Sequence, residues 1–145
     1  ALRTFSKIYA LAGTRVGYGV APKRIIDLLE RVRAPFNVNS VAQAGALASL
    51  SDPDQVSRSR DLNRRAKEYL YRELERLGIP YTPTQANFLW IDTQRDCREV
   101  FEKLLRVGVI VRTGDIFGCP THIRVTTGTD EQNARFIEAL AKAVA

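Results

Sequence analysis

The 145-residue sequence predicts an α/β protein whose second part is a small α+β domain, with an antiparallel sheet carrying helices on one face. Two observations support this class. Segments with apolar residues at helical spacing alternate with short runs rich in β-branched and aromatic residues. After Gly78, these segments follow in the order β-α-β-β-α, which builds a single sheet with its helices packed on one side. A long charged segment, residues 52–77, separates the two parts of the chain.

The first part of the chain is expected to begin at the end of a strand and continue with strand, helix and helix. Residues 14–21 are rich in β-branched and aromatic residues, which favours a strand. A proline opens the helix predicted over residues 23–33, and the next helix, residues 41–50, is capped by Asn39 or Ser40. This last helix is apolar on all sides, a pattern typical of a buried helix.

The charged segment predicts one long helix that links two domains. Asp52 is placed to be its N-cap, a proline follows at the first helical position, and Gly78 ends it. Some 25 residues at about 1.5 Å each give a length of about 38 Å. We expect the domain boundary inside this helix near Asp61, which gives domains of residues 1–60 and 61–145.

The second part contains three expected strands and two expected helices. The strands span residues 87–92, 109–112 and 122–127, and the helices span residues 97–107 and 130–144. Asp96 and Thr129 stand where N-caps are needed, and Gln132 completes a capping box with Thr129. Along the last strand Arg124 alternates with apolar residues, so it points away from the predicted core.

The composition limits the classes of function. The net charge of +6 arises from 17 arginines and 5 lysines against 16 acidic residues. Basic and acidic residues are interleaved, which favours solvated helices with i,i+4 ion pairs over a nucleic-acid surface. A basic module that binds polyanions remains an alternative, and its affinity would fall steeply with salt. No apolar run approaches the 18 residues of a membrane span. Cys97, Cys119 and His122 do not have the spacing of a metal site, and we expect both cysteines to be free.

One short segment carries most of the chemistry. Residues 4–18, Thr-Phe-Ser-Lys-Ile-Tyr-Ala-Leu-Ala-Gly-Thr-Arg-Val-Gly-Tyr, place Lys7 directly after Ser6 and eight positions before Arg15. A deprotonated lysine forms an imine with an aldehyde, and a hydroxyl and a planar guanidinium suit a phosphate. The cofactor that bears both an aldehyde and a phosphate is pyridoxal 5′-phosphate (PLP). The alternative is a buried strand-and-turn segment whose lysine is incidental.

This segment resembles the lysine segment of the fold-type-I PLP-dependent aminotransferases, and most closely that of the histidinol-phosphate aminotransferases. The resemblance implies that Lys7 holds PLP and transfers protons, and that Ser6 and Arg15 hold its phosphate. It also implies that the chain is the C-terminal portion of a longer PLP-dependent transferase and is inactive alone. Residues 1–60 would be the end of the large PLP-binding domain, and residues 61–145 the small domain.

Two further motifs share the resemblance. In the loop over residues 34–40, Phe36 would lie beside the substrate side chain and Asn37 would offer it an amide. Arg124, in His-Ile-Arg-Val-Thr-Thr-Gly-Thr, would grip a substrate carboxylate, and Arg112, in Val-Ile-Val-Arg-Thr-Gly, a substrate phosphate. The alternative for the loop is a hinge that Phe36 anchors. The alternative for Arg112 and Arg124 is that each forms a structural ion pair.

The function that the resemblance implies is transamination. Glutamate and histidinol phosphate would exchange their amino group through PLP in histidine biosynthesis, in a cytoplasmic homodimer without nucleic acid, membrane or metal. A PLP-dependent threonine-phosphate decarboxylase, with much the same lysine segment, is one alternative. Another class I or II aminotransferase is a second.

Overall fold

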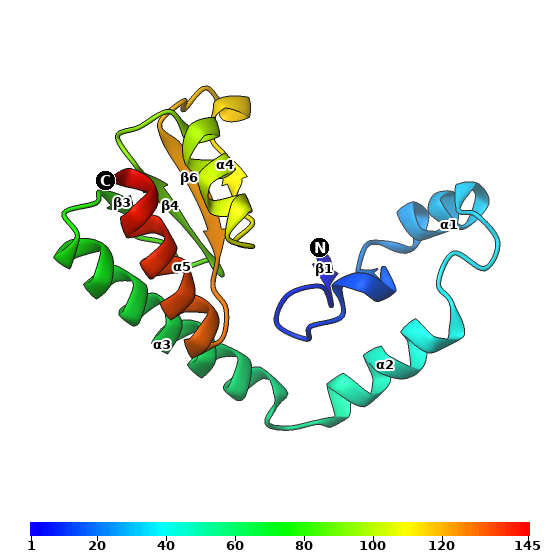
Figure 1. Cartoon of the computed structure of the whole chain (residues 1–145). Helices are drawn as coiled ribbons and strands as arrows, with labels where there is room; N and C mark the ends of the chain where they lie inside the picture. Colours follow the sequence, from blue (N-terminus) through cyan, green and yellow to red (C-terminus); the bar gives the residue numbers. More distant parts are fainter. The chain divides into compact units, whose positions relative to one another are not determined.

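The computed structural model describes all residues from Ala1 to Ala145, and they form two compact units, Ala1–Arg60 and Asp61–Ala145. The chain contains five α-helices and two antiparallel sheets, which confirms the α/β class. Figure 1 shows the course of the chain through these elements. The division falls inside helix α3 (Gln55–Arg76), so the first residues of this helix belong to unit 1 and the rest to unit 2. None of the five helices combines the length and the apolarity that crossing a bilayer requires.

Unit 1 is built around a two-stranded antiparallel sheet. Its elements are β1 (Leu2–Thr4), the 3₁₀ helix η1 (Ala12–Thr14), β2 (Gly17–Gly19), α1 (Lys23–Val32), α2 (Ser40–Ser51) and the start of α3. A Cβ atom on Gly17 would lie 2.7 Å from the carbonyl oxygen of Arg3, so only glycine lets the two strands approach this closely. Strand β2 is shorter than the strand predicted over residues 14–21. One reason is that η1 and its C-cap, Arg15, occupy the first of these positions.

Helix α2 forms where it was predicted but is less buried within this chain than its composition suggests. The Oδ1 atom of Asn39 accepts the N–H of Ala42 at 2.8 Å, which makes Asn39 the N-cap. Only Ala42 and Ala46 are buried, whereas Val41 is 74% exposed and Leu47 is also exposed. The small sheet of unit 1 offers too little surface to cover a helix that is apolar on every side.

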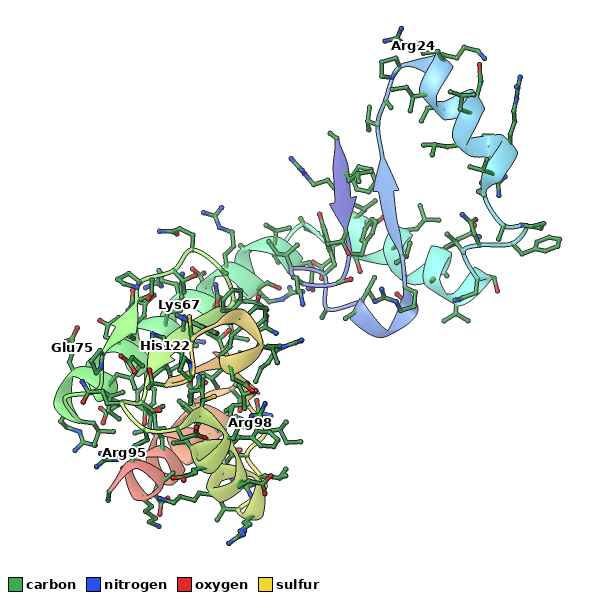
Figure 2. All side chains as sticks on the ribbon, turned by 90° about the horizontal axis from the view of Figure 1, so that it is seen from above. Arg24, Lys67, Glu75, Arg95, Arg98 and His122 are labelled. Carbon is green, nitrogen blue, oxygen red and sulfur yellow. The ribbon has the colours of Figure 1, made fainter.

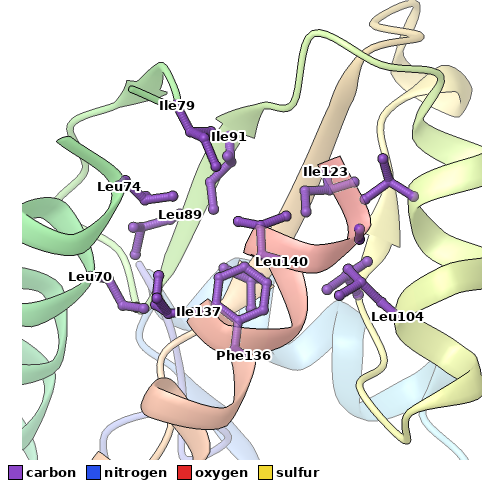
Figure 3. Close-up of a cluster of buried hydrophobic side chains, with 14 of the residues drawn as sticks. Leu70, Leu74, Ile79, Leu89, Ile91, Leu104, Ile123, Phe136, Ile137 and Leu140 are labelled. Atoms are coloured by element: carbon purple, nitrogen blue, oxygen red, sulfur yellow. The ribbon is translucent and has the colours of Figure 1, made fainter. Parts of the chain in front are cut away.

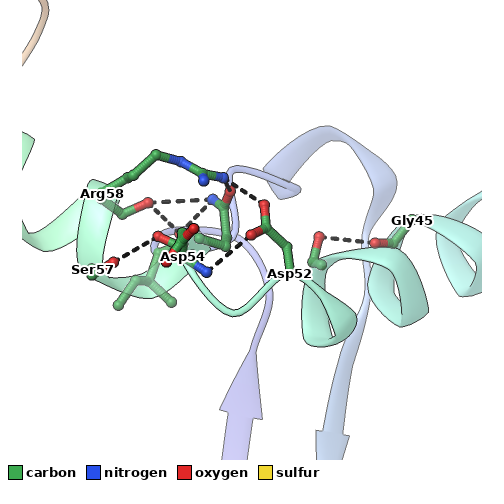
Figure 4. Close-up of polar contacts among 9 residues, drawn as sticks. Gly45, Asp52, Asp54, Ser57 and Arg58 are labelled. Atoms are coloured by element: carbon green, nitrogen blue, oxygen red, sulfur yellow. Dashed lines mark hydrogen bonds and ion pairs between the residues drawn. The ribbon is translucent and has the colours of Figure 1, made fainter.

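The junction between α2 and α3 differs from the prediction. Helix α3 begins at Gln55, and Asp52 ends α2 instead of capping α3. The Oδ1 atom of Asp52 accepts the N–H of Asp54 at 3.0 Å, and its Oδ2 atom pairs with Arg58 (Figure 4). The hydrogen bond from Arg58 is the main reason that the pKa of Asp52 lies below its usual value. A tight turn thus occupies the positions where the first helical turn was expected.

Unit 2 contains a four-stranded antiparallel sheet in the order β3-β4-β6-β5. Its elements after α3 are β3 (Tyr81–Thr82), β4 (Phe88–Asp92), α4 (Cys97–Arg106), β5 (Arg112–Thr113), the 3₁₀ helix η2 (Asp115–Phe117), β6 (His122–Thr126) and α5 (Asp130–Val144). Strand β3 was not predicted, because two residues are too few to show an alternating pattern. Strand β5 begins at Arg112 rather than at residue 109, since the preceding residues do not pair with β6.

The start of β3 is held by a tyrosine. The hydroxyl of Tyr81 donates a hydrogen bond of 2.7 Å to Oε1 of Glu75, and its ring stacks on Tyr71 at 4.5 Å between ring centres. The hydrogen bond to the carboxylate raises the pKa of Tyr81 to about 12, because it favours the protonated phenol.

The caps predicted for the two helices of unit 2 are confirmed. The carboxylate of Asp96 accepts the backbone N–H groups of Arg98 and Glu99 at the start of α4. Thr129 and Gln132 form the expected reciprocal capping box at the start of α5. Cys97 and Cys119 are both free, as expected.

One face of the sheet carries the core of unit 2 (Figure 3). Alternate residues of β4 and β6 are buried on this face, and they pack with α3, α4 and α5 in one cluster that includes Leu70, Leu74, Leu89, Ile91, Val100, Leu104, Ile123, Val125, Phe136, Ile137 and Leu140. This confirms the predicted sheet with helices on one face. The remaining alternate residues, among them Arg124, lie on the opposite face.

Candidate functional site

The predicted lysine segment forms a closed loop between β1 and β2, which we call the lysine loop (residues 5–16). The backbone N–H of Phe5 donates to the carbonyl oxygen of Val16 at 3.2 Å and thereby closes the loop. The ring of Phe5 is 4% exposed and lies 5.0 Å from the ring of Tyr9 and 5.9 Å from that of Tyr18. The packing of these aromatic rings therefore supports the segment that carries Lys7.

Helix α3 holds the lysine loop from its first two turns. The carbonyl oxygen of Ile8 accepts a hydrogen bond from Oγ of Ser59 at 2.7 Å and another from Nε2 of Gln55 at 3.1 Å. Residues four apart lie on the same face of a helix, so both donors reach the same oxygen. This contact fixes the residue next to Lys7. Sequence analysis missed it, because two polar residues on a charged helix give no signal of a partner 47 or 51 positions away.

Lys7 is exposed, and its Nζ atom has neither a hydrogen-bond partner nor an ion-pair partner. The other four lysines each have one: Lys23 binds Asp27, Lys67 binds the Thr84 carbonyl (Figure 2), Lys103 binds the Ala143 carbonyl, and Lys142 binds Glu138. Lys7 is therefore the one lysine of this chain whose amine has no partner within the chain.

Ser6 and Arg15 lie in the same loop as Lys7. The hydroxyl of Thr4 donates to Oγ of Ser6 at 2.7 Å, so the hydroxyl proton of Ser6 remains available for another acceptor. Arg15 adopts a left-handed backbone conformation, with φ at 59°, and ends η1. Its guanidinium donates to the carbonyl oxygen of Ala12 at 2.8 Å and has no carboxylate partner. An amine, a hydroxyl and an unpaired guanidinium in one loop are a donor set that fits PLP.

Phe36 and Asn37 lie in the loop between α1 and α2, away from any packing. Phe36 is 97% exposed and has φ at 54°, an uncommon conformation for a residue other than glycine. Asn37 is exposed as well. A side chain this exposed touches almost nothing, so the structure of unit 1 does not bring these two residues into contact with Lys7. The alternative of an anchoring phenylalanine is wrong for this chain, because the ring anchors nothing.

The two predicted substrate arginines lie together in unit 2. Arg112 on β5 and Arg124 on β6 stand directly opposite each other in the antiparallel register. Like charges in this arrangement repel each other. Neither guanidinium forms an ion pair with a carboxylate of the chain, so the alternative of structural ion pairs does not hold within this chain. Two adjacent cations without a counterion form a site suited to an anion.

Aromatic rings take the place of the missing carboxylates. The Cζ atom of Arg124 lies over the ring of Phe88 at 5.1 Å from its centre, and that of Arg112 lies over the ring of Phe117 at 5.6 Å. These are cation–π distances. We call Arg112, Arg124, Phe88 and Phe117 the arginine cluster. Sequence analysis identified the two arginines but not the two rings, although Phe88 stands one position before a buried strand residue and so must point to the arginine side of the sheet.

Two more aromatic side chains border the arginine cluster. Trp90 is the residue opposite Arg124 on β4, and its ring packs against that of Phe117 in a T-shaped arrangement with 5.8 Å between the ring centres. His122 stacks on Trp90 at 5.4 Å, and its Nδ1 atom lies 3.1 Å from the hydroxyl of Thr121 (Figure 2). The face of the sheet opposite the core is therefore both aromatic and cationic.

Comparison with known proteins identifies the family. The family model described as aminotransferase class I and II matches residues 1–140. The chain belongs to the aminotransferase class I and II family. Membership in this family confirms the resemblance that the lysine segment indicated and matches the fold just described.

Members of this family named histidinol-phosphate aminotransferase are similar to the chain, as the sequence predicted. The chain is 60% identical to that of Moorella thermoacetica over 144 residues, and 50% identical to that of Caldicellulosiruptor saccharolyticus over 139 residues. These matches cover 99% and 96% of this chain but only 37% and 39% of the two relatives. The chain thus spans well under half the length of the aminotransferases that it matches.

Solved aminotransferase structures share the fold. The histidinol-phosphate aminotransferase of Sinorhizobium meliloti, in complex with pyridoxal-5′-phosphate, matches 99% of this chain and 40% of its own with a TM-score of 0.90 at 24% identity. The aspartate aminotransferase of Thermus thermophilus with maleate matches 98% of this chain and 40% of its own, with a TM-score of 0.82 at 26% identity. Both confirm the expected aminotransferase fold of the two units.

Proposed function

We propose that the protein containing this chain is a PLP-dependent aminotransferase that exchanges an amino group between glutamate and histidinol phosphate, in histidine biosynthesis. The free amine of Lys7, in one loop with Ser6 and Arg15, is the observation that carries this proposal. The 60% identity to a histidinol-phosphate aminotransferase supports the choice of substrates. Membership in the aminotransferase class I and II family supports PLP as the cofactor.

The residues of the lysine loop would divide the work on the cofactor. PLP supplies the electron sink of transamination. The Nζ atom of Lys7 would bind the cofactor, and would then carry the proton that leaves and returns to the substrate carbon. Ser6 would donate its free hydroxyl proton to the cofactor phosphate, because Thr4 already occupies its oxygen as a donor. The guanidinium of Arg15 would complete the phosphate site.

The remaining predicted residues would bind the substrates. Arg124 would hold the carboxylate of glutamate, and Arg112 together with Arg124 would hold the phosphate of histidinol phosphate. A guanidinium binds either group in a bidentate manner, which suits two anions of different shape. Phe36 and Asn37 would contact the substrate side chain. This role would also account for a phenylalanine that is almost fully exposed within this chain.

The proposal extends to the domains and the assembly. Unit 1 would be the end of the large PLP-binding domain, and unit 2 the small domain. The exposed apolar side chains of α1 and α2, such as Leu28 and Val41, support association with further protein surface, and we propose a homodimer. Two free cysteines are in keeping with a cytoplasmic enzyme, because thiols stay reduced in that compartment.

Reductive trapping of PLP tests the assignment of Lys7. The enzyme that contains this chain is incubated with PLP, the bond between lysine and cofactor is made permanent with borohydride, and the modified peptides are mapped by mass spectrometry. We expect modification to concentrate on Lys7 and to be lost in Lys7→Arg. The matched control is Lys23→Arg, which removes another exposed lysine, one that is paired with Asp27. Equal modification of Lys7 and Lys23 in the native chain would contradict the proposal.

The activity is tested in the enzyme that contains this chain. Glutamate and imidazole-acetol phosphate should give 2-oxoglutarate and histidinol phosphate, and Lys7→Ala should abolish the reaction. Release of CO₂ from threonine phosphate, without formation of 2-oxoglutarate, would instead identify the enzyme as a decarboxylase.

A further inference from the structure

We propose that Phe88 and Phe117 are positioning residues, which hold the guanidinium groups of Arg124 and Arg112 ready for an anion. The inference rests on the anion-binding role proposed for these arginines and assigns a role to residues that the proposed function does not use. It follows from the way in which two unpaired cations are held side by side.

The arrangement of the arginine cluster needs an explanation, because its two positively charged side chains come from facing positions on neighbouring strands and repel each other. Arg112 and Arg124 stand in register on neighbouring strands, where mutual repulsion would drive their flexible side chains apart into solvent. Neither is held by a carboxylate. Each instead lies over a phenylalanine ring, at 5.6 Å for Arg112 and 5.1 Å for Arg124. The electron-rich ring face attracts the cation and so opposes the repulsion.

A ring is a better support than a carboxylate for an arginine that must bind an anion. A guanidinium has five N–H donors and no acceptor, and a carboxylate partner would occupy two of these donors. A ring face attracts the charge while leaving the donors in the guanidinium plane unoccupied. The rings therefore order the two arginines without competing with a phosphate or carboxylate.

The two rings are themselves attached to rigid parts of unit 2. Phe88 begins β4, which pairs with β6 over five residues, so its ring is fixed relative to Arg124. Phe117 ends η2, and this short helix is tied to α4 by the ion pair between Arg98 and Asp115, with 2.7 Å from Nε to Oδ2. Each ring thus has its own support, and the loss of one should affect mainly the arginine above it.

Titration of the 145-residue chain with inorganic phosphate tests the inference by NMR of the arginine Nε–Hε groups. Phe88→Leu and Phe117→Leu remove the rings but keep apolar side chains. Phe88→Tyr and Phe117→Tyr keep the rings and should restore binding. Phe101→Leu is the matched control, because Phe101 lies on α4 and packs against the core instead of an arginine. Arg112→Gln and Arg124→Gln test the anion site itself.

We expect each leucine variant to bind phosphate about 2- to 5-fold more weakly, as follows from the usual strength of an exposed cation–π contact. Phe88→Leu should shift the Nε–Hε signal of Arg124 and leave that of Arg112 in place, and Phe117→Leu should do the reverse. The tyrosine variants and Phe101→Leu should bind within about twofold of the native chain. A purely structural role of the rings would not give signal changes that are confined to one arginine each.

The outcomes separate the inference from the proposed function. If the arginine variants lose phosphate binding and the leucine variants keep it, the inference is wrong and the anion site stands. If the arginine variants bind phosphate as the native chain does, or if phosphate shifts neither arginine signal in the native chain, the anion site fails and the inference fails with it.

Discussion

The hydrogen bonds from α3 to the lysine loop lead to a quantitative prediction about the mobility of Lys7. The carbonyl oxygen of Ile8 accepts from Ser59 at 2.7 Å and from Gln55 at 3.1 Å. Ser59→Ala removes the shorter bond and leaves the longer one. A net contribution of about 0.5–1.5 kcal/mol per hydrogen bond then makes local opening of the loop about 2- to 12-fold more frequent. In the double variant with Gln55→Ala the half-buried oxygen has no partner, which costs about 1–3 kcal/mol.

Native-state hydrogen exchange measures this opening at the amide of Leu11, which donates to the carbonyl oxygen of Phe5 within the lysine loop. Its exchange should accelerate about 2- to 12-fold in Ser59→Ala and about 5- to 150-fold in the double variant. Ser57→Ala is the matched control, because the hydroxyl of Ser57 lies on the same helix but bonds only to the carbonyl of Asp54 at 2.9 Å. The reasoning fails if Ser57→Ala accelerates exchange at Leu11 as much as Ser59→Ala does. It fails equally if the double variant leaves Leu11 unchanged.

Two further predictions concern unit 2. Leu140 is fully buried in the core cluster, so Leu140→Ala should lower the free energy of unfolding, measured by chemical denaturation, by about 2–5 kcal/mol. The control Leu105→Ala removes an exposed side chain and should change this free energy by no more than about 0.5 kcal/mol. Equal effects of the two substitutions would contradict the assignment of the core. Tyr81 should ionise with a pKa of about 12 in an NMR titration. This folded-state pKa lies above the unfolded value near 10, so the stabilisation from the bond to Glu75 is complete below pH 10 and is lost as the pH rises through 12. Tyr81→Phe should remove this part of the pH dependence of stability.

Local sequence patterns predicted those elements whose determinants are local. Asp96 and Thr129 were identified as caps because a cap bonds to backbone groups two or three residues away, and such spacing is visible in the sequence. Asp52 has the same chemistry, but the N–H of Asp54 and the side chain of Arg58 hold it in a turn that ends the preceding helix. A capping residue between two helices can serve either of them, and the sequence does not distinguish the two cases.

The candidate site shows the same limit. Lys7, Ser6 and Arg15 were found together because they lie within one loop, and Arg112 and Arg124 because each ends or interrupts an apolar run. The supports of the lysine loop and of Arg124 lie far away in the sequence. The ring of Phe88 meets an arginine on another strand, a register that only the folded sheet defines. The expectation for α2 failed for a related reason, since composition indicates a preference for burial but not the surface that provides it.

The repulsion between Arg112 and Arg124 has a practical consequence for any measurement on this protein. An anion that binds only the folded state raises the free energy of unfolding, by about 2.7 kcal/mol at a concentration of 100 times its dissociation constant. At the anion site that we propose for these two arginines, phosphate or sulfate from a buffer would act as a stabilising ligand of unit 2 through a mass-action effect on folding. Melting temperatures of variants are therefore comparable only at one fixed anion concentration. In a phosphate-free buffer, substitution of either arginine removes the repulsion without the loss of a bound anion, and so raises stability rather than lowering it.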